Sequence, residues 1–266
     1  MINGLTREEI LNKLLDDEQY YGSFGKQFRS NSDIKKLLED PLSFGQPTPL
    51  TQPLVAGRYF HMNYLEKEKY DADPFTFSEA GSRNSKMYKE ELKSTGEELL
   101  LLTKEKWDLD ECLQLLEDHP VITDLCRGDN IEYEVPFIGY PLNDEGEEDA
   151  LIWKGKADII NHDERLIIDI KTTSDIARFK NSARVYNYDS QAFIYRQFAE
   201  QTYTTNGWEF IFVVVCKKSK RIGLYNCSEE FYGRGMQKVV QATEVYKDMF
   251  LDPLFEKDKY LLSDTL

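Results

Sequence analysis

The chain has 266 residues, of which 41% are hydrophobic, and it carries a formal net charge of −15 at pH 7. This apolar content is enough for a folded core, which excludes a mostly disordered chain. The sequence contains no run of about 18 apolar residues, so we expect no membrane-spanning helix. It begins without a basic stretch followed by an apolar one, and its four cysteines form no CxxC pair. We therefore expect a cytoplasmic protein with reduced thiols and without a cysteine-bound metal.

The acidity bears on the possible partners. A protein that binds nucleic acid usually carries a basic surface for the phosphates, so a net charge of −15 argues against that class. Net charge, however, does not report how charges are distributed, and a bound divalent metal reverses the sign of a carboxylate-rich site. The motifs must therefore decide the question.

The first 128 residues predict a helical part. Helices are expected from a capping box at residues 6–9, from residue 32 to a proline at 41, over 55–66, and around 87–100 and 108–117. Residues 45–53 are typical of a loop. The segment 71–93 is polar and has no apolar period, so we expect it to be mobile.

Residues 129–266 predict a sheet with helices. Strands are expected over residues 131–140, 151–160, 166–171 and 210–216, with a hairpin partner at 221–226 and helices at 190–202 and 229–250. The acidic stretch 143–149 is expected to be a solvated loop. The stretch 210–216 is almost entirely apolar, which favours a central strand that is buried on both faces. The order predicts a mixed α/β sheet flanked by helices, forming one compact unit with the N-terminal part.

Three residues on neighbouring strands carry the chemistry. Asp169 and Lys171 are two apart in one strand and therefore share a face. Asp158 lies near the end of the preceding strand, and a short turn folds that strand back beside Asp169. Two carboxylates with one ammonium suit Mg²⁺, which takes oxygen ligands, and suit the hydrolysis of a phosphodiester. The alternative is an edge strand whose polar face meets solvent.

Two further features favour the metal site. Gln191 and Tyr195 are four apart on a predicted helix and share one face. His61, far upstream in a predicted helix, has the side chain that most often binds metals. Each has a simpler alternative, since a helical histidine can be structural and a Gln/Tyr pair can be helix surface.

These elements together resemble the RecB-like branch of the PD-(D/E)xK nucleases, most closely the exonuclease VIII type found in phages and prophages. The resemblance rests on Ser30-Asn31-Ser32, Gly57, His61, Leu65 and Glu66, residues 104–107 with His119-Pro120, residues 169–173, and the stretch from Phe179 to Tyr195. It implies a restriction-endonuclease-like core with an N-terminal helical elaboration that carries the histidine. Two departures from the family motif are an alanine at 157 and an aspartate at 169.

The resemblance also implies roles for individual residues. Asp158 and Asp169 would bind the metal together with His61 and the backbone carbonyl of Ile170, and Lys171 would be the catalytic lysine. Gln191 and Tyr195 would contact or support the DNA end. An acidic position on the first strand matches Glu134 or Glu132, and Glu134 fits it better.

The implied function is a metal-dependent DNA exonuclease that degrades duplex ends in the 5′ to 3′ direction during phage recombination. Mg²⁺ is the expected cofactor, with Mn²⁺ as a substitute. A ring-shaped homo-oligomer, an annealing protein for single strands and the host cytoplasm are expected from the resemblance alone. Two alternatives remain: a structure-specific or single-strand nuclease, and a catalytically silent DNA-binding protein with the same fold.

A basic and aromatic segment follows the third strand. It contains Arg178, Lys180 and Arg184 without an acidic residue, and Tyr186 and Tyr188 lie beside them. Such a mixture suits a path for DNA phosphates with base stacking. The tyrosines could instead pack into the core. A second basic cluster at 217–221 is equally typical of a solvated hairpin tip.

Overall fold

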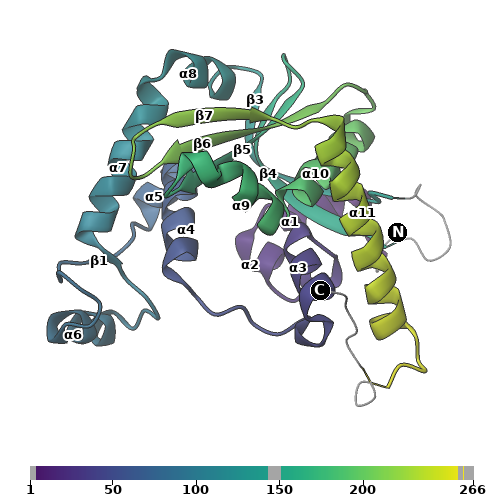
Figure 1. Ribbon diagram of the computed structural model, residues 1–266, viewed down its shortest axis with the longest axis horizontal. Coiled ribbons are helices and arrows are strands. Elements are labelled where there is room, and N and C mark those ends of the chain that lie inside the picture. Colours follow the sequence, from purple (N-terminus) through teal and green to yellow (C-terminus); the bar gives the residue numbers. More distant parts are fainter. Residues whose placement is uncertain (1–3, 143–150, 257–259, 261–266) are drawn as a thin grey trace.

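The computed structural model describes residues 4–142, 151–256 and 260 (Figure 1). In this part of the chain, helices flank a five-stranded sheet (Figure 1). The expected mixed α/β fold is thereby confirmed. The prediction for residues 143–149 falls outside the described residues.

The sheet has the strand order β3-β4-β5-β6-β7. Its strands are β3 (Ile131–Gly139), β4 (Trp153–Asn161), β5 (Leu166–Thr173), β6 (Glu209–Cys216) and β7 (Ile222–Asn226). Neighbouring strands are antiparallel except β5 and β6, which run parallel. All residues of β6 after Glu209 are buried. This confirms the expected central strand, because only a strand covered on both faces can be apolar throughout.

Helices cover both faces of the sheet. One face packs against α3 (Asn31–Glu39), α9 (Phe179–Val185), α10 (Tyr188–Tyr203) and α11 (Glu229–Tyr246). The other face packs against α4 (Gln52–Leu65), α7 (Thr103–Asp118) and α8 (Pro120–Cys126). Side chains of β5 alternate between these layers: Ile167 belongs to the first, and Ile168 and Ile170 belong to the second. A π-helical turn (Lys247–Leu251) follows α11.

The N-terminal helices α1 (Arg7–Leu14) and α2 (Asp17–Tyr21) pack against the end of β3. The predicted capping box is present, since Thr6 and Glu9 bind each other's backbone amides. Ile10 and Ile138 share a small hydrophobic cluster. The backbone of Arg29 then bridges to Trp153, which ties this segment to β4.

The segment between α4 and α7 is more regular than the sequence predicts. It forms α5 (Lys67–Ala72), β1 (Phe77–Ser78), α6 (Lys86–Thr95) and β2 (Leu101–Leu102). Ser78 donates to Glu91, Arg83 binds both carboxylate oxygens of Glu105 at 2.8 and 2.5 Å, and a small apolar cluster forms around Ala80, Tyr88 and Leu100. The sequence missed this regular structure, and the mobility expected for residues 71–93 stays a prediction.

Helix boundaries also differ from the prediction. α7 begins at Thr103 rather than near 108, because the Glu105 carboxylate accepts from the Leu102 amide and caps the helix. Among the described residues, no helix combines the length and the apolar character needed to cross a membrane.

Candidate active site

The site lies where β4 and β5 separate. These strands pair only over residues 159–161 of β4 and 166–168 of β5. Asp158 is the first residue of β4 beyond this pairing, and its Oδ2 accepts a hydrogen bond from the Ile170 amide at 2.8 Å. The carboxylate thus replaces a ladder partner that the open strand no longer offers. The Asp158 side chain is 12% exposed, so it lies in the mouth of the gap.

β3 and β4 change faces in the middle of their pairing. Tyr133 and Ile159 pack on one side of the sheet, whereas Val135 and Ala157 pack on the other. In a regular strand, residues two apart share a face. Glu134 accompanies the switch in β3, because its φ of 51° places the backbone in the left-handed region. The regular alternation of strand faces that the sequence predicts is therefore interrupted at Glu134.

The pairing of β3 and β4 is interrupted between the Tyr133–Ile159 and Val135–Ala157 pairs, and Glu134 and Asp158 lie at this interruption with carboxylate oxygens within 4.8 Å of each other. Like charges in this arrangement repel each other, and a left-handed non-glycine residue costs of order 1–3 kcal/mol. Burial, followed by the charges of Asp158 and Glu66, raises the pKa of Glu134 to about 8. Strain and repulsion of this kind concentrate at functional sites, where a bound cation relieves them.

The structure distinguishes between the two candidate glutamates on β3. The Glu132 side chain is 56% exposed and lies 3.2 Å from His162. Glu132 therefore contacts His162 rather than Asp158, and Glu134 is the acid that the structure brings to the site.

His61 reaches the site from α4. Its Nε2 lies 2.8 Å from the carbonyl oxygen of Ile170, and its Nδ1 lies 3.4 Å from Oδ2 of Asp158. Burial lowers the pKa of His61, but the charge and hydrogen bond of Asp158 outweigh it and raise the pKa to about 9. The pKa of Asp158 is lowered in turn, because His61 and Lys171 offset the effect of its burial.

Three of these side chains form a potential metal site. Ligand atoms of His61, Glu134 and Asp158 all lie within 4.8 Å of one another. Two carboxylates suit a hard cation such as Mg²⁺, and Mn²⁺ shares that preference for oxygen. The donor set fits a divalent metal, because the pKa of Glu134 stays raised to about 8 by burial and by the charge of Asp158 although Lys156 lies 3.8 Å from it.

Asp169 and Lys171 form the second half of the site. The residues face the same layer, as expected, and Lys171 Nζ lies 2.5 Å from Oδ2 of Asp169. Gln191 Nε2 donates to Oδ1 of Asp169 at 2.5 Å. Burial raises the pKa of Asp169 to about 6, because the opposing effect of Lys171 is partly cancelled by Asp158. In this structure the carboxylate is directed to Lys171 and Gln191, and it is not part of the group of three.

Tyr195 supports the site by packing against β4. Its side chain is buried, and its hydroxyl accepts a hydrogen bond from the Lys156 amide at 3.2 Å. A Cβ atom at Gly155 would lie 2.5 Å from the tyrosine ring, so only glycine allows this approach. Tyr195 therefore fixes β4 just before Asp158, and Gln191 is the member of the pair that reaches the site.

The predicted DNA-binding segment lies on the surface. Arg178, Lys180 and Arg184 are all exposed in η3 (Ile176–Arg178) and α9. Tyr188 instead packs into the core edge, where its ring stacks on Phe212 with centroids 5.5 Å apart. The same ring lies 5.1 Å from the Lys171 ammonium, which it helps to position.

Residues 43–251 match the family model described as a PDDEXK-like domain of unknown function (DUF3799). The chain belongs to this family. The matched range contains all the site residues of the preceding paragraphs, and membership confirms the resemblance to PD-(D/E)xK nucleases.

One solved structure agrees with the fold of this PDDEXK-like domain. The crystal structure of a "Putative exonuclease" from Eubacterium rectale is similar with a TM-score of 0.61 at 14% identity, over 94% of this chain and 95% of that chain. At this identity the likeness shows the fold alone. A phage related exonuclease from Haemophilus somnus 129PT aligns with a TM-score of only 0.31 at 15% identity, over 82% of this chain and 93% of that chain, which carries no argument. None of the curated proteins compared matches the sequence.

One pair of residues that borders the site had no role assigned to it from the sequence. Lys156 Nζ lies 3.8 Å from Glu134, and it binds Asp17 at 2.6 Å. Lys156 was visible only as a basic residue near Asp158. Asp17 offered no signal, because it is far away in the chain and precedes the matched range.

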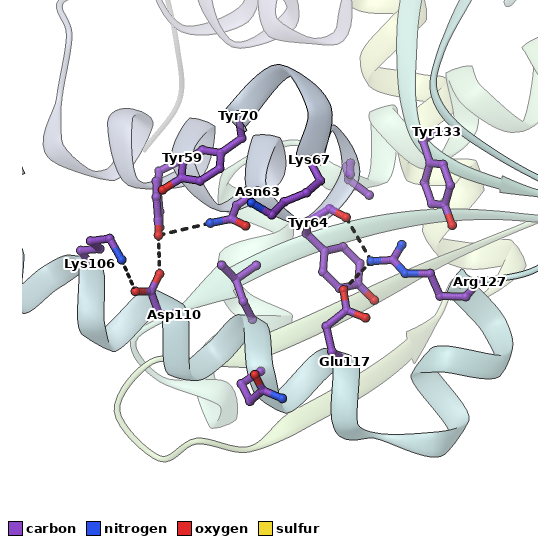
Figure 2. Close-up of a pocket in the computed structure, with 13 residues that line it drawn as sticks. Tyr59, Asn63, Tyr64, Lys67, Tyr70, Lys106, Asp110, Glu117, Arg127 and Tyr133 are labelled. Carbon is purple, nitrogen blue, oxygen red and sulfur yellow. Dashed lines mark hydrogen bonds and ion pairs between the residues drawn. The ribbon is translucent and has the colours of Figure 1, made fainter. Parts of the chain in front are cut away.

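A second polar cluster of the PDDEXK-like domain surrounds a cavity of about 730 Å³ (Figure 2). Tyr59 donates to Asp110, which also binds Lys106, and Arg127 binds Glu117 at 2.6 Å. His61 is two residues from Tyr59 in α4 and so points to nearly the opposite side of the helix. The cavity contains none of the site residues, but its contacts hold α4 against α7 and thereby aim His61.

Proposed function

We propose that this PDDEXK-like domain is a metal-dependent DNA exonuclease that hydrolyses phosphodiester bonds at duplex ends. The observation that carries the proposal is the convergence of His61, Glu134 and Asp158, whose ligand atoms all lie within 4.8 Å of one another. The Asp169–Lys171 pair adjoins this group. Repelling carboxylates next to a buried ammonium suit a cation and a phosphate better than they suit stability.

His61, Glu134 and Asp158 would hold the metal, with Asp169 and the Ile170 carbonyl as adjacent donors. Mg²⁺ is the proposed ion, and Mn²⁺ its substitute. When bound, the metal polarises the phosphate and lowers the pKa of a bound water.

Lys171 would orient the attacking water or stabilise charge on the phosphate, because its ammonium is fixed between Asp169 and the Tyr188 ring. Lys171 keeps its positive charge despite its burial, because the neighbouring Asp169 and Asp158 raise the pKa of Lys171. Gln191 holds Asp169 in place through its amide. Arg178, Lys180 and Arg184 would guide the DNA backbone to this point.

The finer features of the proposal rest on the resemblance to exonuclease VIII-type enzymes. They are a 5′ to 3′ direction, a role in phage recombination in the host cytoplasm, a homo-oligomer around DNA and a partner that anneals single strands. The N-terminal part, residues 1–128, and the nuclease core, residues 129–266, are proposed to act as one unit.

Digestion of linear duplex, single-stranded and circular DNA tests the proposal. The purified protein should degrade 5′-labelled linear duplex only with Mg²⁺ or Mn²⁺ and should spare closed circles. Asp158→Ala should lower the rate by about a thousandfold or more, because a metal ligand contributes several kcal/mol. Asp124→Ala, an exposed acid on α8, is the matched control and should keep the wild-type rate.

Each other outcome has its own meaning. Cleavage of circles or preference for single strands would replace the exonuclease with a structure-specific or single-strand nuclease. DNA binding without cleavage in any metal would indicate a silent DNA-binding protein. Full activity of Asp158→Ala would remove the proposed metal site.

A further inference from the structure

The N-terminal helix α2 places an acid between two lysines at the edge of the proposed active site. Asp17 Oδ1 lies 2.6 Å from Lys156 Nζ, and Asp17 Oδ2 lies 3.5 Å from Lys69 Nζ. The lysines come from β4 and α5, and only the tertiary structure brings them to α2. Each oxygen of one carboxylate thus faces a different ammonium group.

Lys156 is the fixed member of this arrangement. Its side chain is only 7% exposed, and its ammonium lies 4.8 Å from the Tyr20 ring centroid and 5.9 Å from that of Tyr21. A buried ammonium needs an anion, because burial without a partner is costly. Glu134 lies 3.8 Å from this ammonium and Asp17 only 2.6 Å, so the place of Asp17 offers the closer contact for an anion.

Asp17 is the replaceable member. Its side chain is 50% exposed, and it belongs to the first turn of a five-residue helix. A helix this short contributes little stability of its own. An exposed carboxylate can therefore move away at low cost, provided that another anion takes its place beside Lys156.

The position of the lysines indicates which anion that is. Lys156 Nζ lies 3.8 Å from Glu134, a member of the potential metal group. An anion at the place of Asp17 would therefore adjoin the site where DNA is cleaved. A phosphate offers the same kind of oxygen acceptors as a carboxylate, and lysine binds it as a point charge.

We propose that Lys69 and Lys156 form a binding site for a DNA backbone phosphate next to the cleaved bond, and that Asp17 occupies this site in the absence of DNA. The proposal rests on the proposed function. DNA must displace Asp17, so the apparent affinity of the resting protein is reduced by the fraction in which the acid blocks the lysines.

Binding of linear duplex with Ca²⁺ in place of Mg²⁺ tests the site, together with Asp17→Asn and the matched control Glu18→Gln. Both substitutions remove one negative charge from α2, but only Asp17 contacts the lysines. Asp17→Asn should tighten binding about two- to fivefold, the effect of losing one competing ion pair, and should steepen its salt dependence. Glu18→Gln should change the affinity much less. Melting curves check that both variants fold.

A second variant links the effect to the lysines. Lys69→Met should weaken DNA binding and should abolish most of the gain from Asp17→Asn in the double variant. An equal effect of Asp17→Asn and Glu18→Gln would overturn the proposal, as would a gain that persists in full without Lys69. If the wild-type protein degrades DNA while these tests fail, only the phosphate site is refuted. If the wild-type protein neither binds nor degrades DNA, the proposed function fails and this site fails with it.

Discussion

Two groups of charged side chains lie on opposite sides of α4 and differ in how their charges are balanced. In the cavity of Figure 2, each acid has its own cation, as in the Lys106–Asp110 pair. In the site, Glu134 lies close to Asp158, and burial together with the charge of Asp158 raises the pKa of Glu134 to about 8. We therefore expect the cavity group to stabilise the fold and the site to bind a ligand that supplies positive charge.

The two groups are nevertheless coupled through one helix. Tyr59 is anchored in the cavity group, and His61 is presented to the site from the same turn region of α4. The charge-paired network on one side of the helix thus positions His61, a residue of the proposed metal site, on the other. Tyr59 and His61, which serve these two groups, are about half a turn of helix apart.

The largest difference between the groups should appear when each loses a lysine. Lys171→Met should slow DNA cleavage by about 10²- to 10⁴-fold, the range for a positioned proton-transfer or charge-stabilising group. Lys106→Met should leave the rate nearly unchanged, because Lys106 pairs with Asp110 in the cavity network and lies over the Phe77 ring rather than against a residue of the site. Initial rates on linear duplex with saturating Mg²⁺ measure both. Similar losses in the two variants would mean that the cavity takes part in the reaction.

A smaller effect, on the free energy of unfolding rather than on the rate, is expected when the cavity group loses a contact. Tyr59→Phe removes a hydroxyl that binds Asp110 from a fully buried ring. We expect the free energy of unfolding to fall by about 1–3 kcal/mol, the contribution of a hydrogen bond to a charged group. Urea denaturation measures this loss. Tyr186→Phe, at an exposed ring, should have no effect. If Tyr59→Phe is as stable as the wild type, the cavity network does not anchor α4.

The smallest effects concern exposed cations. Removing Arg178, Lys180 or Arg184 should each reduce the slope of log affinity against log salt by about one unit, if each contacts one phosphate. Lys220→Ala is the control, because Lys220 is paired with Asp108 and Glu111 of α7. Unchanged slopes in all three variants would place the DNA path elsewhere.

Much of the fold could be predicted from local patterns. The apolar run that became β6 and the alternation of Asp169 and Lys171 in β5 were both confirmed. These signals are strong because burial on one or both faces of a sheet constrains every residue of the strand. The segment between α4 and α7 escaped prediction, since it is held by polar contacts of Ser78 and Arg83 and by a small apolar cluster around Tyr88 whose members come from separate short elements.

The site was predictable in its parts rather than in its assembly. The sequence identified His61, Asp158, Asp169, Lys171 and Gln191, and the structure brings them together. It left Glu134 and Glu132 as alternatives, because the two acids are two residues apart in one strand and are therefore expected on the same face. The left-handed backbone of Glu134 interrupts this alternation of faces, and no local sequence pattern predicts such an interruption.

By itself, the sequence determined the strands of the central sheet, most of its principal helices and the residue types of the site, because the buried face of each element leaves a periodic pattern along a few neighbouring residues. The tertiary structure alone decided which acid lies close to Asp158, which partner fills the place beside Lys156, and which tyrosine supports β4 from the core. These contacts join residues such as Asp17 and Lys156 that are distant in the chain. Their strength depends on distance and burial in space, which spacing along a sequence does not encode.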